Sequence, residues 1–237
     1  MQIKNVNLKN IAVNDNSGFI TGNSQLLYLD AGNSASYPGS GTVWYDLSGN
    51  TNNTTGTSNT TYNSGNGGYF NFVDPGYFTT ASSKYNTAYT GKTVFLSAYL
   101  VGSMSVGQFR CMFGSSSGVS NRNFNLYLYY TGSAYQLHFS AGGAGSFSSN
   151  MNYASANWGT FAVTHTTGGA VTYYYNGQQN GTASQAFSQY LSTTSENVGA
   201  SDNYWNGRVG VVSIYGSALT ANQILMMHNS IRGRYGI

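Results

Sequence analysis

A site that binds a sugar needs an aromatic ring and several hydrogen-bonding groups close together, and one short run of this chain supplies both. Its residues are Asp202, Asn203, Tyr204 and Trp205. An aromatic ring offers an apolar plate with a polar edge, and carboxylate and amide groups hydrogen-bond hydroxyls. The run is therefore a candidate glycan site. In the competing interpretation, Trp205 begins a strand and anchors the hydrophobic core.

Three tyrosines, Tyr127, Tyr129 and Tyr174, lie in predicted strands and provide a second candidate surface across a sheet. A tyrosine-rich sheet face also suits contact with another protein, because tyrosine is enriched at interfaces. Both uses of this surface, glycan binding and protein docking, stay open.

Hydrolysis of a glycoside requires two carboxyl groups that flank the scissile bond. The chain has six acidic side chains, and its one glutamate, Glu196, has a single acid within ten residues, Asp202. Six residues and a predicted turn separate the two, so they do not form a same-strand pair. The sequence therefore predicts that the protein is not an enzyme.

Charge is unusually scarce in this chain. Charged residues make up 6% of it, with a scattered net charge of +3, whereas about 25% is usual. No segment interleaves basic and aromatic residues as a nucleic-acid groove does, so no nucleic-acid partner is expected. A signal peptide, a membrane span and a membrane partner are not expected either. The one cysteine, Cys111, can form no internal disulfide and is predicted to be buried.

The elements that must position these residues are mostly strands. Period-two alternation is clearest over residues 93–101, 124–130, 134–140 and 158–165. Residues 171–177 end in Asn-Gly, which indicates a hairpin. Short strands separated by turns favour a two-sheet sandwich in one domain over 25–237. Residues 1–24 are predicted to be an N-terminal extended arm, 48–68 a polar connection outside the core, and 69–79 a short strand pair.

One helix is predicted near the C-terminus. Thr220 and Gln223 have the spacing of a capping box, and Gly233 is the expected stop. An apolar stripe should pack the helix on the edge of the sandwich. That stripe comprises Ile224, Leu225, Met227, His228 and Ile231.

Several segments resemble laminin-G-like domains. Residues 157–165 and 171–177 are similar to the tryptophan strand and the tyrosine, asparagine-glycine hairpin of that family, and 205–209 and 214–220 to later strands and the entry to its helix. The resemblance implies an all-β, concanavalin A-like antiparallel β-sandwich jelly roll with one short C-terminal helix. Residues 37–42, 44–50 and 232–236 resemble the copies found in tailed-bacteriophage virion proteins.

Laminin-G-like domains often hold calcium at the rim of the sandwich, so the resemblance makes calcium the one candidate cofactor. Asp74 and Asp202 are the loop acids that would serve, because calcium prefers several oxygen ligands. Alternatively, each aspartate bonds nearby backbone amides in its turn. His138, His165 and His228 have no ligand spacing, so zinc is not expected.

Together these observations predict a non-enzymatic bacteriophage virion structural protein. It would be a surface-exposed capsid decoration or a tail or fibre component that docks through protein–protein contacts. The alternative is a carbohydrate-binding adhesin that recognises host surface glycans. The expected partners are other virion proteins, a second copy of the chain and a cell-surface glycan, and the expected location is the virion.

Overall fold

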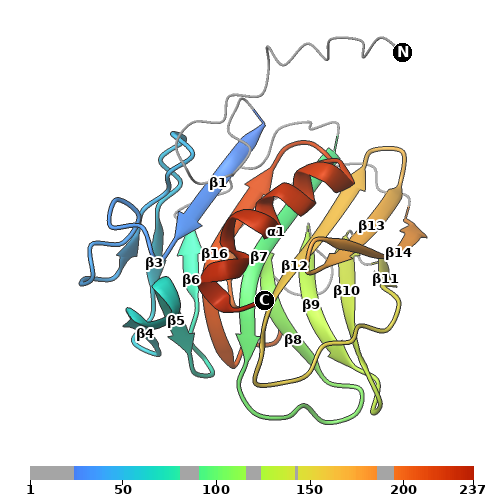
Figure 1. Cartoon of the computed structure of the whole chain (residues 1–237), viewed down its shortest axis with the longest axis horizontal. Coiled ribbons are helices and arrows are strands. Elements are labelled where there is room, and N and C mark those ends of the chain that lie inside the picture. The colour runs from blue at the N-terminus through green and yellow to red at the C-terminus, as the bar shows by residue number, and fades with distance from the viewer. Residues whose placement is uncertain (1–23, 81–90, 116–123, 142–143, 186–194) are drawn as a thin grey trace.

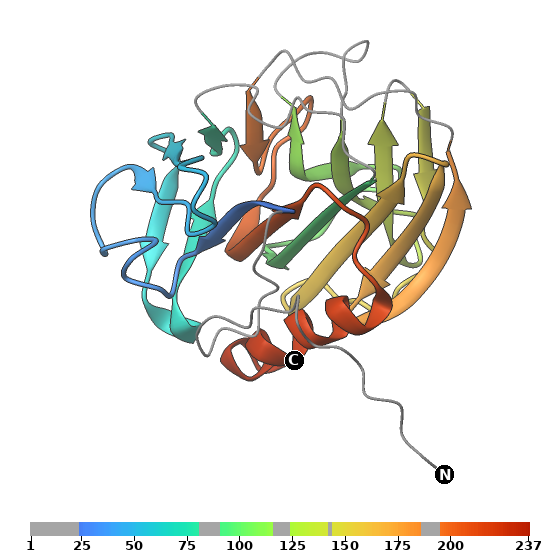
Figure 2. The same cartoon turned by 90° about the horizontal axis from the view of Figure 1, so that it is seen from above.

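The computed structural model describes residues 24–80, 91–115, 124–141, 144–185 and 195–237. They form two antiparallel eight-stranded sheets, with one α-helix on the outside of the first (Figures 1 and 2). The predicted all-β sandwich with a C-terminal helix is confirmed. The arm predicted over residues 1–24 lies outside the described residues, apart from Ser24.

The strand order of the first sheet is β14-β13-β12-β7-β16-β5-β4, and β1 also pairs with β16. Its strands are β1 (Gln25–Asp30), β4 (Thr60–Asn63), β5 (Tyr69–Phe72), β7 (Gly91–Leu100), β12 (Trp158–Thr166), β13 (Ala170–Tyr175), β14 (Gln178–Ser184) and β16 (Gly207–Tyr215). The order of the second sheet is β11-β10-β9-β8-β15-β6-β3-β2. Its strands are β2 (Val43–Trp44), β3 (Thr54–Gly56), β6 (Phe78–Thr80), β8 (Phe109–Ser115), β9 (Asn125–Tyr130), β10 (Tyr135–Ala141), β11 (Ala144–Phe147) and β15 (Glu196–Val198).

The core between the sheets follows the predicted alternation. The inward positions of β7, β9 and β10 are buried apolar side chains, and Cys111 is buried and free of disulfides. In β12, Phe161 and Val163 join this core, while Trp158 and Ala162 face the helix. Both faces of β12 are therefore covered.

Two expectations about residues 48–79 are wrong. The segment 48–68 contains β3, β4 and a 3-10 turn, η1 (Gly65–Gly67), rather than only a polar connection. β5 and β6 do not pair with each other but belong to opposite sheets. Their inward rings meet across the core, with the centroids of Phe70 and Phe78 4.6 Å apart. Alternation showed which side chains are buried, but not which sheet carries them.

The helix α1 (Ala221–Tyr235) crosses the outer face of the first sheet rather than its edge (Figure 1). The predicted capping box of Thr220 and Gln223 is present. The helix runs to Tyr235 and is capped by Gly236 (φ 71°) rather than stopped at Gly233, because Tyr235 belongs to its buried face. No helix in the described part of the chain is long and apolar enough to cross a membrane.

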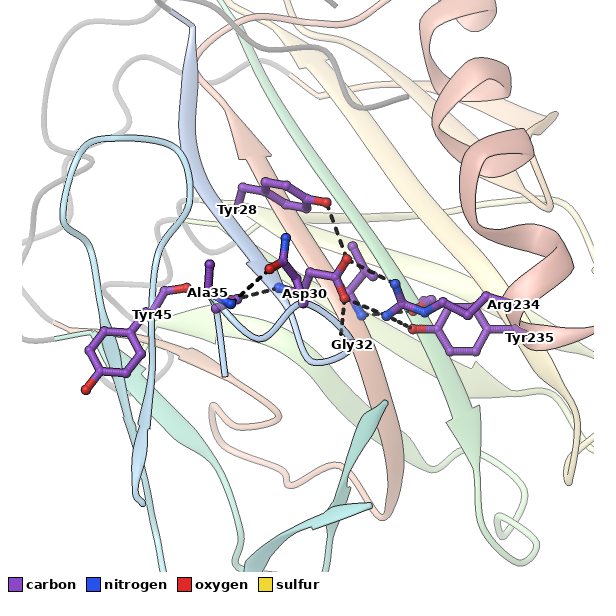
Figure 3. A network of polar contacts seen from close by, with 11 residues as sticks. Tyr28, Asp30, Gly32, Ala35, Tyr45, Arg234 and Tyr235 are labelled. Carbon is purple, nitrogen blue, oxygen red and sulfur yellow. Dashed lines mark hydrogen bonds and ion pairs between the residues drawn. The ribbon is translucent and has the colours of Figure 1, made fainter. Parts of the chain in front are cut away.

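A polar network fastens the end of α1 to the end of β1 (Figure 3). The Arg234 guanidinium donates to both oxygens of Asp30, at 3.0 and 2.5 Å, and to the Tyr235 hydroxyl at 2.8 Å. Asp30 also accepts the backbone N–H of Gly32 at 2.8 Å. A bidentate arginine–carboxylate pair fixes geometry as well as charge, so the network sets where the helix ends on the sheet.

Residues 44–52 cover the edge of β1 that does not pair with β16. The Asp46 carboxylate accepts three backbone N–H groups at 2.9 Å each, those of Tyr28, Ser48 and Asn52. The side-chain amides of Asn50 and Asn52 donate to β1 carbonyls at 2.7 Å each. Side chains therefore replace a neighbouring strand along β1, which shields an otherwise unpaired edge.

Candidate functional site

The outer face of the second sheet carries a group of aromatic rings across β8, β9, β10 and β11. In these strands the core-facing residues alternate with rings that point outward. The Phe109 ring centroid lies 4.6 Å from that of Tyr129 and 5.1 Å from that of His138. His138 in turn lies 4.4 Å from Phe147, which is 42% exposed. The outer aromatic cluster comprises Phe109, Tyr127, Tyr129, His138 and Phe147.

The loop between β15 and β16 lies over one side of this cluster and forms a pocket. The Tyr127 hydroxyl donates a 2.7 Å hydrogen bond to Asp202 Oδ1, which holds the tip of the loop against the sheet. A bridge between Ala200 and Tyr204 closes the base of the loop. The pocket has a volume of about 230 Å³ and is lined by Phe109, Tyr127, His138, Asp202 and Asn203.

The electrostatics of the pocket are set by one buried phenol and one exposed carboxylate. Burial raises the pKa of Tyr127 above its usual value, and the nearby Cys111 thiol adds to the effect. The hydroxyl therefore stays protonated at neutral pH and remains a donor to Asp202. Asp202 and Asn203 are exposed at the rim. An apolar wall with a few polar groups at its edge is typical of small-ligand sites.

The structure separates the residues of the run 202–205. Asp202 and Asn203 line the pocket. Tyr204 lies beside it, with its ring 6.3 Å from that of Tyr77. Trp205 is fully buried at 0% exposure, so it cannot be a sugar plate. The competing interpretation of Trp205 as a core residue is the one that the structure supports.

Two aromatic wall residues, Phe109 and His138, were missed by the sequence reasoning, and one tyrosine was misplaced. Tyr174, expected beside Tyr127 and Tyr129, is 4% exposed beneath α1 on the other sheet. The available signal for the missed pair was alternation, because both occupy outward positions opposite Tyr129 and Tyr127. Only the strand register shows that these positions meet.

Asp74 faces a guanidinium, and Asp202 accepts the hydroxyl of Tyr127. Asp74 Oδ2 lies 3.6 Å from Nη1 of Arg110, and the same nitrogen donates to the Tyr204 carbonyl at 3.3 Å. A guanidinium between the two loops disfavours a second cation there. Across the ranges that the structure describes, no three histidine, cysteine or acidic side chains gather as metal ligands.

The one glutamate of the chain, Glu196, does not line the pocket. Glu196 is 1% exposed and paired with Lys92 inside the sandwich, at 3.3 Å from Oε1 to Nζ. Residues 114–118 spell Gly-x-Ser-x-Gly, although residues 116–118 lie outside the described part of the chain.

Comparison with known proteins bears on the fold. The profile of the family described as "Concanavalin A-like lectin/glucanases superfamily" matches residues 96–225, more than half of the chain. No curated protein sequence matches the chain.

Three solved structures illustrate the similarity. Domain 4 of AbnA, an extracellular arabinanase from Geobacillus stearothermophilus solved in complex with arabinotriose, has a TM-score of 0.66 at 17% identity over 86% of this chain and 98% of its own. The binding domain of botulinum neurotoxin DC in complex with SialylT has a TM-score of 0.65 at 14% identity, over 88% of this chain and 52% of the toxin chain. Botulinum neurotoxin type C, whose cell entry depends on two ganglioside molecules, has a TM-score of 0.64 at 14% identity, over 88% of this chain and 51% of the toxin chain. This chain spans about half of those toxin chains, and such identities show the fold alone.

Proposed function

This chain belongs to the concanavalin A-like lectin/glucanase superfamily, and we propose that it is a non-catalytic module that binds carbohydrate in the pocket beneath the 199–205 loop. The observation that carries the proposal is the convergence of aromatic rings, a carboxylate and an amide on one pocket of about 230 Å³. Phe109 and His138 would contact the apolar face of a sugar, while Asp202 and Asn203 would hydrogen-bond its hydroxyls.

The absence of catalysis is part of this proposal. Asp202 is the one acidic side chain that lines the pocket, whereas glycoside hydrolysis uses two carboxyl groups. Glu196, the nearest acid in sequence, is sealed inside the sandwich. The pocket can therefore orient a saccharide but lacks the second group that would cleave it.

The similar structures favour carbohydrate as the ligand class. The arabinanase domain was solved with arabinotriose, and a toxin binding domain with SialylT. Those ligands belong to those proteins, and they support the proposal by showing that domains of this fold carry sugar sites.

Binding to a glycan array, followed by titration of the best ligand, tests the proposal. We expect Phe109→Ala to raise the Kd at least tenfold, since a buried aromatic contact in a binding site contributes about 2 kcal/mol or more. Tyr127→Phe, which removes only the hydroxyl that holds Asp202, should raise it by about threefold to tenfold. Tyr45→Ala is the matched control, because Tyr45 is an aromatic residue of 42% exposure that does not line the pocket.

Two results would contradict the proposal. One is an array on which the unaltered protein retains no glycan. The other is a glycan whose Kd is the same for the unaltered protein, Phe109→Ala and Tyr127→Phe.

We also propose that the chain is a surface component of a bacteriophage virion. The support is the resemblance of residues 37–42, 44–50 and 232–236 to virion proteins, together with the low charge of 6%, which suits packing against other proteins. A particle component that binds glycans would serve as an adhesin, so the two proposals are compatible.

Gold-labelled antibody against this domain, applied to purified particles, tests the location. We expect label on the capsid or tail in electron micrographs, and a preimmune serum provides the control. Label that stays with unassembled protein and never with particles would refute the virion assignment.

A further inference from the structure

Arg208 lies on the outer face of the first sheet, the opposite side of the sandwich from the pocket. Its guanidinium carbon is 4.4 Å from the ring centroid of Tyr99 and 5.0 Å from that of Tyr69. The two rings come from β7 and β5, the strands on either side of β16. Cation–π contacts on both sides hold the guanidinium plane in place. We call Arg208, Tyr69 and Tyr99 the arginine clamp.

The side chain of Arg208 has no hydrogen-bond or ion-pair partner among the described residues. Its Nε is buried and makes no hydrogen bond. Two other arginines do have acidic partners. Arg110 pairs with Asp74, and Arg234 pairs with Asp30. A rigid, partly desolvated guanidinium with unused donors is costly unless another group accepts its hydrogen bonds.

None of the acidic side chains that the structure describes accepts a hydrogen bond from Arg208. Each of the five is engaged elsewhere, in an ion pair, with backbone N–H groups beside β1 or with a tyrosine hydroxyl. They are Asp30, Asp46, Asp74, Glu196 and Asp202. Beside the clamp lies Asn71, the partly exposed residue that faces Arg208 across the β5–β16 pair. A ligand at this position would therefore meet the positive charge of Arg208 and the neutral amide of Asn71.

We propose that the arginine clamp is a second binding site, one that takes an oxyanion group of a ligand. The planar fork of a guanidinium matches two oxygens of a carboxylate, sulfate or phosphate. Arg208 would donate to them from its exposed edge, while Tyr69 and Tyr99 hold the fork in position. The site does not depend on the proposed pocket, because it lies on the other sheet.

Thermal unfolding in sodium sulfate and in sodium phosphate, compared with sodium chloride at the same ionic strength, tests this site. We expect either oxyanion to raise the Tm of the unaltered protein by more than that of Arg208→Gln, because the variant keeps only the general stabilisation that sulfate and phosphate give by exclusion from protein surfaces. Arg232→Gln is the matched control, because it removes the same charge from an exposed helix position. Arg208→Lys should bind sulfate and phosphate at least tenfold more weakly than the unaltered protein, since an ammonium lacks the planar fork. Equal Tm shifts in the unaltered protein and in Arg208→Gln would overturn the proposal.

Nuclear magnetic resonance of arginine side chains keeps the test independent of folding of the variants. Titration of the unaltered protein with sulfate should shift the Arg208 Nε–H signal and leave that of Arg110 in place. Titration with sulfated, uronic-acid and neutral oligosaccharides then distinguishes the sources of the oxyanion. Charged sugars that bind more tightly than inorganic sulfate identify an acidic glycan as the ligand. Charged sugars that bind no more tightly than inorganic sulfate identify a free anion. A signal that no oxyanion shifts contradicts the site.

Discussion

Replacing Lys92 by methionine is expected to lower the free energy of unfolding by about 3–5 kcal/mol, the usual cost of breaking a buried ion pair. Lys92 and Glu196 have side chains of 2% and 1% exposure, and their charged atoms lie 3.3 Å apart. Glu196 Oε2 makes no hydrogen bond within the described residues. The variant would therefore leave a carboxylate inside the sandwich without its cation.

The dependence of this loss on pH follows from the Glu196 carboxyl. Burial raises its pKa above the ordinary value of 4.5, and Lys92 opposes that rise. Without Lys92 the pKa rises further. Because a raised folded-state pKa means that stability is complete below the unfolded pKa and is lost as the pH climbs, the deficit of Lys92→Met should be small at pH 4 and larger at pH 7.

Urea unfolding at the two pH values measures this deficit. The control is Lys92→Met combined with Glu196→Leu, which replaces both charges by apolar groups and should recover most of the lost stability. A single variant as stable as the unaltered protein at pH 7, or a double variant no better than the single one, would contradict the account.

Most of the fold was predictable because the side chains that face the core between the sheets alternate along the long strands. The inward residues of β7, β9 and β10 were identified from that alternation, and the start of α1 from its capping box. The partners of short strands were not predictable, as β5 and β6 show, because two rings that meet in one core can come from either sheet. The end of α1 was misplaced for a related reason, since the contacts of Arg234 and Tyr235 extend the helix past Gly233.

The candidate site was predictable on its loop side only. Asp202 and Asn203 are adjacent in the sequence, so a local pattern can find them. Phe109 and His138 reach the same pocket from two other strands, and their proximity is a product of the registers of β8, β9 and β10. The clamp around Arg208 escapes sequence reasoning in the same way, because Tyr69 and Tyr99 come from separate strands.

Trp205→Ala is expected to cost about 3–5 kcal/mol of folding free energy, as truncation of a fully buried tryptophan does. The side chain is 0% exposed and belongs to the core between the sheets. Its ring nitrogen donates to the Arg208 carbonyl at 3.4 Å, and its backbone N–H bonds to Gly199 at the base of the loop. Trp205→Phe retains a large ring and should lose less.

Denaturant unfolding and glycan binding, measured on the same variants, separate the support of the loop from contact with a ligand. Trp205→Ala should lose stability but, at a temperature where it remains folded, keep its Kd within about threefold, a change of roughly 0.7 kcal/mol. Phe109→Ala should do the reverse, because its partly exposed ring lines the pocket. If Trp205→Ala lost binding at unchanged stability, the ligand would have to reach Trp205 itself, and the pocket would be the wrong site.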